Sequence, residues 1–270
     1  MNERDKQNEK TNRQKRKVAY RSRHRLLSIA LDAARLQQRV RSVLGDDYSN
    51  DWPWVSNKHC GCWYLQPSSS SHSCYFKSTD GHQNTWALSL KRLNLPLVEL
   101  LHRYGGCYLV DSSVRKVLPD SFSRTIPIWA CVLNKIVQRY RNDFGIQHDS
   151  SSWDTKLYTP ASMISPEEHL EISKLIDSRL NLLYESKAIV DPKRLCQILT
   201  KPLRPIWITD SIQHSDTIVS HFEKEYTDFF MIVCCNPSSY LQNKTQKSHI
   251  RWLDEGFYYT PGAADDEVNI

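Results

Sequence analysis

Three short apolar runs, each ending abruptly at polar side chains, constrain the fold of this 270-residue chain more than any other feature. They occupy residues 107–110, 206–208 and 229–235, and the first polar residue after them is Asp, Thr and Asn, respectively. Continuous apolar strands are typical of sheets that are buried on both faces, and the carboxyl ends of parallel strands border a ligand crevice. We therefore predict an α/β fold, with a mostly parallel or mixed sheet flanked by helices and preceded by a basic N-terminal helical arm.

Helical patterns fill the segments between these runs. Residues 95–104 are apolar at helical spacing and are followed by Gly105. Pro127 suits the first turn of a second helix, and Ser165 stands three residues before Glu168, which is the spacing of a capping box. Residues 63–65 are predicted to form a strand, whereas residues 252–270 carry no strand or helix pattern.

Positive charge is concentrated at the start of the chain. Residues 1–41 hold 13 Lys and Arg against 4 Asp and Glu, whereas the remainder is net acidic. We predict a disordered basic tail over residues 1–17, an amphipathic basic helix over 18–45 and one α/β domain over 46–270. The arm suits RNA, because each cation bound to a phosphate releases counterions, and a solvated or nuclear-import tail is the alternative. The predicted RNA-binding residues are Arg21, Arg23, Arg25, Arg35, Arg39 and Arg41.

The sequence excludes several classes of protein. No run approaches the ~18 apolar residues of a membrane span, and the N-terminus has no apolar signal core, so we expect a cytoplasmic protein without membrane contact. The glycines form neither the dinucleotide-binding nor the P-loop spacing. No cysteine is followed six positions later by Arg, so the loop of cysteine phosphatases is absent.

The eight cysteines include no C-x-x-C pair and are expected to be reduced thiols, most of them buried. One group of residues offers nitrogen and sulfur ligands for a structural zinc ion, which would make the protein a zinc-bound adaptor rather than an enzyme. Its members are His59, Cys60, Cys62, His72 and Cys74.

Two polar segments are the candidates for chemistry, and each follows a predicted strand. Residues 77–82 (KSTDGH) and 111–116 (DSSVRK) combine cations, hydroxyls and carboxylates. Such groups at strand exits suit a phosphorylated ligand, because backbone amides and cations converge there, and carboxylate oxygens suit Mg²⁺. Ordinary hydrogen-bonded turns are the alternative.

Longer motifs carry a resemblance to a known family. The runs YFKSTDGH (75–82), SLKRLNL (89–95), YLVDSS (108–113), LPDSFSRTIPIWACVLN (118–134) and GAADDE (262–267) resemble the initiator tRNA phosphoribosyl transferase family. The resemblance implies transfer of a phosphoribosyl group from phosphoribosyl pyrophosphate to the 2′-hydroxyl of adenosine-64 of initiator tRNA, which excludes that tRNA from elongation. It also implies a phosphatase-like C-terminal domain, which this sequence lacks. We expect a monomer, and the alternative is an inactive, truncated tRNA-binding fragment.

The implied chemistry suggests roles for individual residues. Cations and hydroxyls must hold the pyrophosphate leaving group while the ribose hydroxyl is kept in line. Asp80 or Asp111 is predicted to bind Mg²⁺ or the attacking hydroxyl, and His82 is the candidate base because imidazole titrates near neutrality. The predicted substrate-binding residues are Lys77, Ser78, Thr79, Ser112, Ser113, Arg115, Lys116 and Arg124.

Overall fold

A five-stranded sheet lies at the centre of the fold. The computed structural model describes residues 3–44, 51–58, 60–65, 72–114, 116–146, 153–208, 228–238, 251–253 and 256–267. The strands are β1 (Trp54–Asn57), β2 (His72–Cys74), β3 (Gly106–Val110), β4 (Leu203–Ile208) and β5 (Phe230–Cys235). All neighbouring pairs are parallel, in the order β2-β1-β3-β5-β4, so the predicted α/β fold with a parallel sheet is confirmed.

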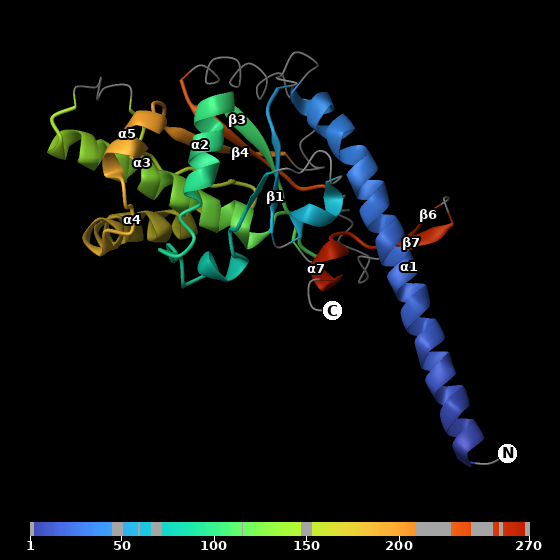
Figure 1. Cartoon of the computed structure of the whole chain (residues 1–270). Helices are drawn as coiled ribbons and strands as arrows, with labels where there is room; N and C mark the ends of the chain where they lie inside the picture. The colour runs from blue at the N-terminus through green and yellow to red at the C-terminus, as the bar shows by residue number, and fades with distance from the viewer. Residues whose placement is uncertain are drawn as a thin grey trace.

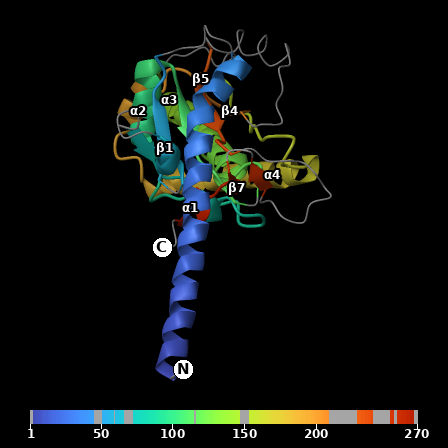
Figure 2. The ribbon, with the colours of Figure 1, turned by 90° about the vertical axis from the view of Figure 1, so that its right-hand side faces the viewer.

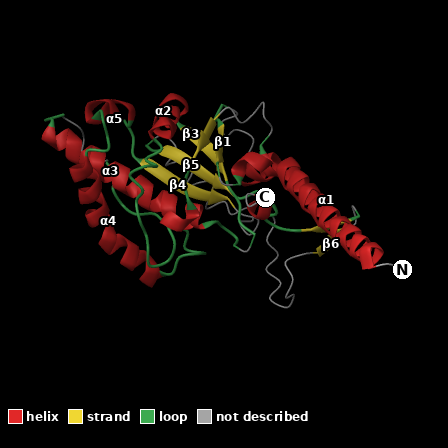
Figure 3. Ribbon diagram, turned by 60° about the horizontal axis from the view of Figure 1, so that its bottom comes forward, coloured by secondary structure: helices red, strands yellow, loops and turns green. Residues whose placement is uncertain are grey.

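Helices cover both faces of this sheet (Figures 1 and 3). On one face lie α2 (Leu95–Tyr104), α3 (Ile126–Asp143), α4 (Pro166–Ser186) and α5 (Pro192–Ile198). Cys107 and Leu109 of β3 pack on that side, whereas Tyr108 and Val110 pack into a second core with α1 (Glu3–Leu44). Successive side chains of a strand point to opposite faces, so an uninterrupted apolar run fills both cores.

The predicted helix starts are present. Pro127 stands in the first turn of α3, where its missing N–H costs no hydrogen bond. The Ser165 hydroxyl accepts a hydrogen bond from the Glu168 amide at 3.2 Å and caps α4. Before α3 the backbone forms η3 (Ser121–Thr125), a single π-helical turn preceded by Asp120.

Helix α1 is longer than the sequence pattern predicts. It is continuous from residue 3, whereas we expected a disordered tail over residues 1–17. The segment contains no glycine or proline and is rich in Lys, Arg, Gln and Glu, which have good helix propensity even without an apolar period. At 1.5 Å per residue the helix extends about 63 Å. Its N-terminal part, residues 3–21, projects beyond the rest of the molecule (Figure 2), and we call it the overhang.

The C-terminal part of the chain packs against α1. Strands β6 (Arg251–Leu253) and β7 (Phe257–Tyr259) form an antiparallel ribbon, and α7 (Ala264–Glu267) follows. Both β7 and α7 contact α1, although residues 252–270 have no pattern that would predict these elements. The strand expected over residues 63–65 is also different, because Gly61–Tyr64 form a short 3-10 helix, η1.

A close backbone contact explains η1. A Cβ atom on Gly61 would lie 2.0 Å from the carbonyl oxygen of Val110, the last residue of β3. Only glycine allows the chain to turn this close to the strand end. None of the described helices is long and apolar enough to cross a bilayer.

Candidate functional site

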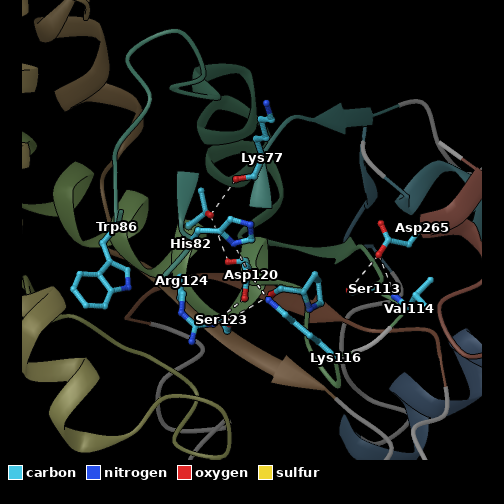
Figure 4. A network of polar contacts seen from close by, with 12 residues as sticks. Lys77, His82, Trp86, Ser113, Val114, Lys116, Asp120, Ser123, Arg124 and Asp265 are labelled. Atoms are coloured by element: carbon cyan, nitrogen blue, oxygen red, sulfur yellow. Dashed lines mark hydrogen bonds and ion pairs between the residues drawn. The ribbon is translucent and has the colours of Figure 1, made fainter. Parts of the chain in front are cut away.

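One buried carboxylate, that of Asp120, binds three cationic or titratable side chains (Figure 4). Its Oδ2 atom lies 2.8 Å from His82 Nδ1 and 2.5 Å from Lys116 Nζ, and its Oδ1 accepts from Arg124 Nη1 at 2.8 Å. Arg124 also donates two hydrogen bonds to Glu168 of α4, at 2.6 and 3.0 Å. We call these five residues the Asp120 cluster.

The cluster joins two segments that are distant in sequence. His82 follows η2 (Ser78–Asp80), whereas Lys116 lies in the loop after β3. A Cβ on Gly81 would lie 2.5 Å from Thr125 Oγ1, and the same hydroxyl donates to the Lys77 carbonyl at 3.3 Å. The segment 77–82 is thus held beside residues 116–125, and Lys116 is the member of the second predicted segment, 111–116, that shares a partner with it.

The Asp120 cluster exposes His82 and Lys116 and buries the Asp120 carboxylate. The side chains of His82 and Lys116 are 52% and 43% exposed, whereas that of Asp120 is 3% exposed. An anion that approaches this surface meets the Lys116 ammonium, whose position is fixed by its ion pair with Asp120. Lys77 is also exposed, but its ammonium points away from the cluster (Figure 4).

The two aspartates predicted to bind a metal have structural partners. Both oxygens of Asp80 accept from Arg92, at 2.8 to 3.2 Å, and Asp80 belongs to the same short helix as Ser78 and Thr79. Asp111 is fully buried, and its Oδ2 accepts from Asn57 Nδ2 at 2.7 Å and from Ser121 Oγ at 2.5 Å. Among the described residues, no group of three His, Cys, Asp or Glu side chains is arranged to hold a metal. This donor set does not fit a resident Mg²⁺, which needs several available oxygens.

The loop after β3 is covered by the C-terminal motif. The Ser113 hydroxyl and the Val114 amide both donate to Asp265 Oδ2, at 3.3 and 3.1 Å (Figure 4). Ser112 is buried, and its hydroxyl lies 3.1 Å from that of Ser238, in the loop after β5. The Asp265 carboxylate thus occupies the Ser113 hydroxyl and the Val114 amide, two donors that a phosphate would otherwise use. Ser112 and Ser113 therefore stabilise the loop after β3 through hydrogen bonds within the protein. Arg115 lies outside the described residues.

Comparison with known proteins identifies the family. Residues 14–269 match the Rit1 N-terminal domain. The chain belongs to this family. It is 34% identical over 258 residues to the tRNA A64-2′-O-ribosylphosphate transferase of Saccharomyces cerevisiae, a match that covers 90% of this chain and 47% of the yeast protein. An uncharacterized protein of Schizosaccharomyces pombe is 35% identical over 245 residues, with coverage of 90% and 48%.

The family suggested by the sequence motifs is therefore confirmed. This Rit1 N-terminal domain spans about half the length of the curated relatives it matches. No solved structure matches it.

The arm of the Rit1 N-terminal domain divides its arginines between two environments. Arg25 Nη2 donates to the Ala263 carbonyl at 3.3 Å, and Arg39 Nη1 donates to the carbonyls of Asn236 and Pro237 at 2.9 and 2.6 Å. These two side chains hold α1 to the body. The exposed members of the predicted RNA-binding set are Arg21, Arg23, Arg35 and Arg41.

The site also depends on residues that the sequence hypothesis missed. Asn57 donates to Asp111 and to the Phe76 carbonyl and accepts from the Phe76 amide, so it joins the exits of β1, β2 and β3. Asp120 and Glu168 are the acids of the cluster. For Asp120 the available signal was its place in the quoted LPDSFSRT run, whereas nothing in the sequence pairs Glu168 with Arg124 across 44 positions.

The cysteines of the predicted zinc group have separate environments. Cys60 Sγ lies 3.7 Å from Asp265 Oδ1, Cys74 is buried beside the Ser56 carbonyl, and Cys62 is exposed. His59 lies outside the described residues. This arrangement gives the zinc hypothesis no support among the residues that are described.

Thiol reactivity offers a test of this arrangement. Burial raises the pKa of the Cys60 and Cys107 thiols and raises that of Cys131 to about 12, so these groups stay protonated and unreactive at neutral pH. We expect one thiol, Cys62, to react rapidly with an alkylating reagent in the native protein, and all eight after denaturation. Mass spectrometry of the labelled peptides locates the modified residue. Rapid native labelling of Cys60 or Cys74 would contradict the described packing.

Proposed function

We propose that this chain takes part in the transfer of a phosphoribosyl group from phosphoribosyl pyrophosphate to the 2′-hydroxyl of adenosine-64 in initiator tRNA. The observation that carries this proposal is the 34% identity, over 90% of the chain, to a protein named tRNA A64-2′-O-ribosylphosphate transferase. We also propose that it acts as a monomer. The proposed location is the cytoplasm, where initiator tRNA is used.

The Asp120 cluster is the proposed site of the donor's phosphates. Departure of pyrophosphate leaves a cation-like ribose carbon and places negative charge on the leaving group, which fixed cations stabilise. Lys116 has an exposed ammonium held by Asp120, and Arg124 lies next to it. Arg115, the neighbour of Lys116 in the sequence, is proposed as a further phosphate ligand. Lys77 is proposed as another, and its side chain would have to turn toward the cluster to serve.

His82 is the proposed base for the 2′-hydroxyl. When Nδ1 donates to Asp120, the neutral ring leaves Nε2 as an acceptor, and the side chain is half exposed to solvent. In the proposed step, Nε2 takes the hydroxyl proton, the ribose oxygen bonds to C1 of the donor, and the bond from C1 to pyrophosphate breaks. Asp111 and Asp80 are assigned to positioning, because Asn57, Ser121 and Arg92 bind their oxygens.

Mg²⁺ enters the proposal as a companion of the donor's pyrophosphate. Mg²⁺ commonly binds substrate phosphates together with few protein carboxylates, and it would neutralise charge on the leaving group. No protein ligand is assigned to it, because Asp80 and Asp111 do not offer a suitable set of oxygens.

Lys116→Gln tests the donor site. We expect this variant to bind phosphoribosyl pyrophosphate at least about 10-fold more weakly by calorimetry, because a hydrogen bond to a charged group contributes about 1.5–3 kcal/mol. Lys174→Gln is the matched control, since Lys174 forms an exposed pair with Glu171 on α4. Equal donor affinity in both variants would remove Lys116 from the site.

Transfer itself is tested with labelled donor, Mg²⁺ and initiator tRNA. Label on the tRNA with the wild-type chain, and a slower reaction with Lys116→Gln, would support the proposed function. Bound tRNA without label at high protein concentration would favour the alternative, in which this chain binds tRNA and does not modify it.

A further inference from the structure

Residues 10–21 of the overhang begin a stretch of unbalanced positive charge. Between Glu9 and Asp32 the sequence has no acidic residue and eight Lys and Arg. Like charges three or four positions apart on a helix repel each other and destabilise it. This part of the helix has few contacts with the body that could compensate, so a polyanion alongside it would stabilise it.

The cations of the overhang continue the face by which α1 packs on the body. His24, Ser28 and Asp32 are buried and stand four residues apart on that face. Steps of three or four residues toward the N-terminus lead to Arg21, Lys17 and Lys10, and Arg13 lies beside them. We call these four exposed residues the cationic row; with Gln14 and Val18 they line one open groove.

The row points along the edge of the sheet where the strands end. Arg39 binds the carbonyls after β5, Asp32 accepts from Ser238 at 2.8 Å, and Arg25 binds the Ala263 carbonyl. Helix α1 therefore crosses the carboxyl ends of the strands before it leaves the body near β7 and α7 (Figure 1). A long ligand bound to the cationic row would therefore extend toward the carboxyl ends of the strands, the edge of the sheet that carries the Asp120 cluster.

The chemistry of the row favours a duplex over a single strand. Proteins that bind single strands stack successive bases on aromatic side chains, and none of the six residues that line the groove is aromatic. The exposed Tyr20 lies outside that lining, and its ring packs edge-on against His24 at 4.1 Å. Four cations spread over about 16 Å of straight helix suit a row of phosphates. Paired RNA displays its 2′-hydroxyls in a wide minor groove next to the phosphates, so backbone contacts alone can present such a hydroxyl.

We propose that the cationic row, Lys10, Arg13, Lys17 and Arg21, binds the phosphate backbone of a double-stranded segment of RNA and directs it toward the carboxyl edge of the sheet. The choice of RNA as the partner rests on the proposed function, whereas the binding itself requires no turnover. Arg25 and Arg39 fasten the helix to the body instead. Among the other exposed cations of α1, Lys15, Arg16, Arg23 and Arg41 lie on other sides of the helix.

The test compares two variants of the full chain with the same loss of charge. In the row variant Lys10, Arg13, Lys17 and Arg21 are replaced by Gln. In the control, Gln replaces two Lys and two Arg that are exposed and lie off the row: Lys15, Arg16, Lys187 and Arg194. Binding to a short RNA duplex is followed by fluorescence anisotropy over a range of salt concentrations. We expect the row variant to bind at least about 10-fold more weakly, with a salt slope shallower by about 3, since each lost phosphate contact removes about 0.7–0.9. The control should stay within about threefold of wild type.

Other outcomes would overturn the proposal. Equal losses in the two variants would mean that only the net charge matters. An unpaired oligonucleotide that binds as tightly as the duplex, with the same dependence on the row, would contradict the choice of a duplex. Donor affinity, measured on the same variants, separates this inference from the proposed function: if duplex binding depends on the row but no variant binds phosphoribosyl pyrophosphate, the function fails and the RNA surface stands.

Discussion

Asp120→Asn is expected to lower the free energy of unfolding by about 2–4 kcal/mol and to remove binding of phosphoribosyl pyrophosphate. Removing one partner of a buried ion pair leaves the other charge uncompensated, and Arg124 is largely buried beneath the exposed Lys116 and His82. The amide also cannot hold three donors, so the cations lose their fixed positions. Urea unfolding followed by tryptophan fluorescence measures the first effect, and calorimetry with the donor measures the second.

The control for Asp120→Asn is the same substitution at an exposed pair. Asp177, whose side chain is 74% exposed, receives a hydrogen bond from Lys135 at 2.8 Å. Exposed ion pairs contribute about 0–1 kcal/mol, so Asp177→Asn should leave stability and donor affinity nearly unchanged. Equal destabilisation by the two substitutions would show that the Asp120 cluster has no special role in the fold.

Gly262→Ala is expected to destabilise the protein by about 2–3 kcal/mol and to release the C-terminal motif from the loop after β3. Gly262 has a φ of 64°, which costs a residue with a Cβ about 1–2 kcal/mol. The added Cβ would also lie 2.1 Å from the Ser113 carbonyl oxygen, so residues 262–265 must move. Hydrogen exchange should then rise at the Val114 amide, which donates to Asp265.

The variant Gly256→Ala separates the cost of the positive φ from the cost of the close contact between the added Cβ and Ser113. Gly256 also has a positive φ, 83°, but a Cβ there meets no atom within 4 Å. This variant should lose only the conformational part, about 1 kcal/mol, and should leave exchange at Val114 unchanged. If both variants lost the same stability, the contact between Gly262 and Ser113 would have no energetic importance.

Much of the sheet could be predicted because its signal is local. The runs that became β3 and β5 are apolar on both faces, and Pro127 and Ser165 mark their helices with standard terminal chemistry. The helix over residues 3–17 escaped prediction because apolar periodicity detects only helices with a buried face. The turn at Gly61 depends on Val110, 49 positions away, which no local pattern reports.

The candidate site was predicted in part for a similar reason. Residues 77–82 and 111–116 attract attention because hydroxyls and charges are concentrated in each. What such a segment does depends on partners elsewhere: Arg92 binds Asp80, Asp265 covers Ser113, and Asp120 joins His82 to Lys116. Several of the side chains that the sequence predicts as ligands, Asp80 and Ser113 among them, therefore have hydrogen-bond partners within the protein that fix the loop conformations.

The mutual packing of α1 and the C-terminal ribbon has a consequence for biosynthesis. Asp32 accepts from the Tyr259 hydroxyl, and Arg25 binds the Ala263 carbonyl, 227 and 238 positions further along the chain. During translation, the first helix leaves the ribosome long before its partners are made. Contacts of such long sequence separation form slowly, so the nascent chain exposes the apolar stripe of α1 until residues 259–263 emerge.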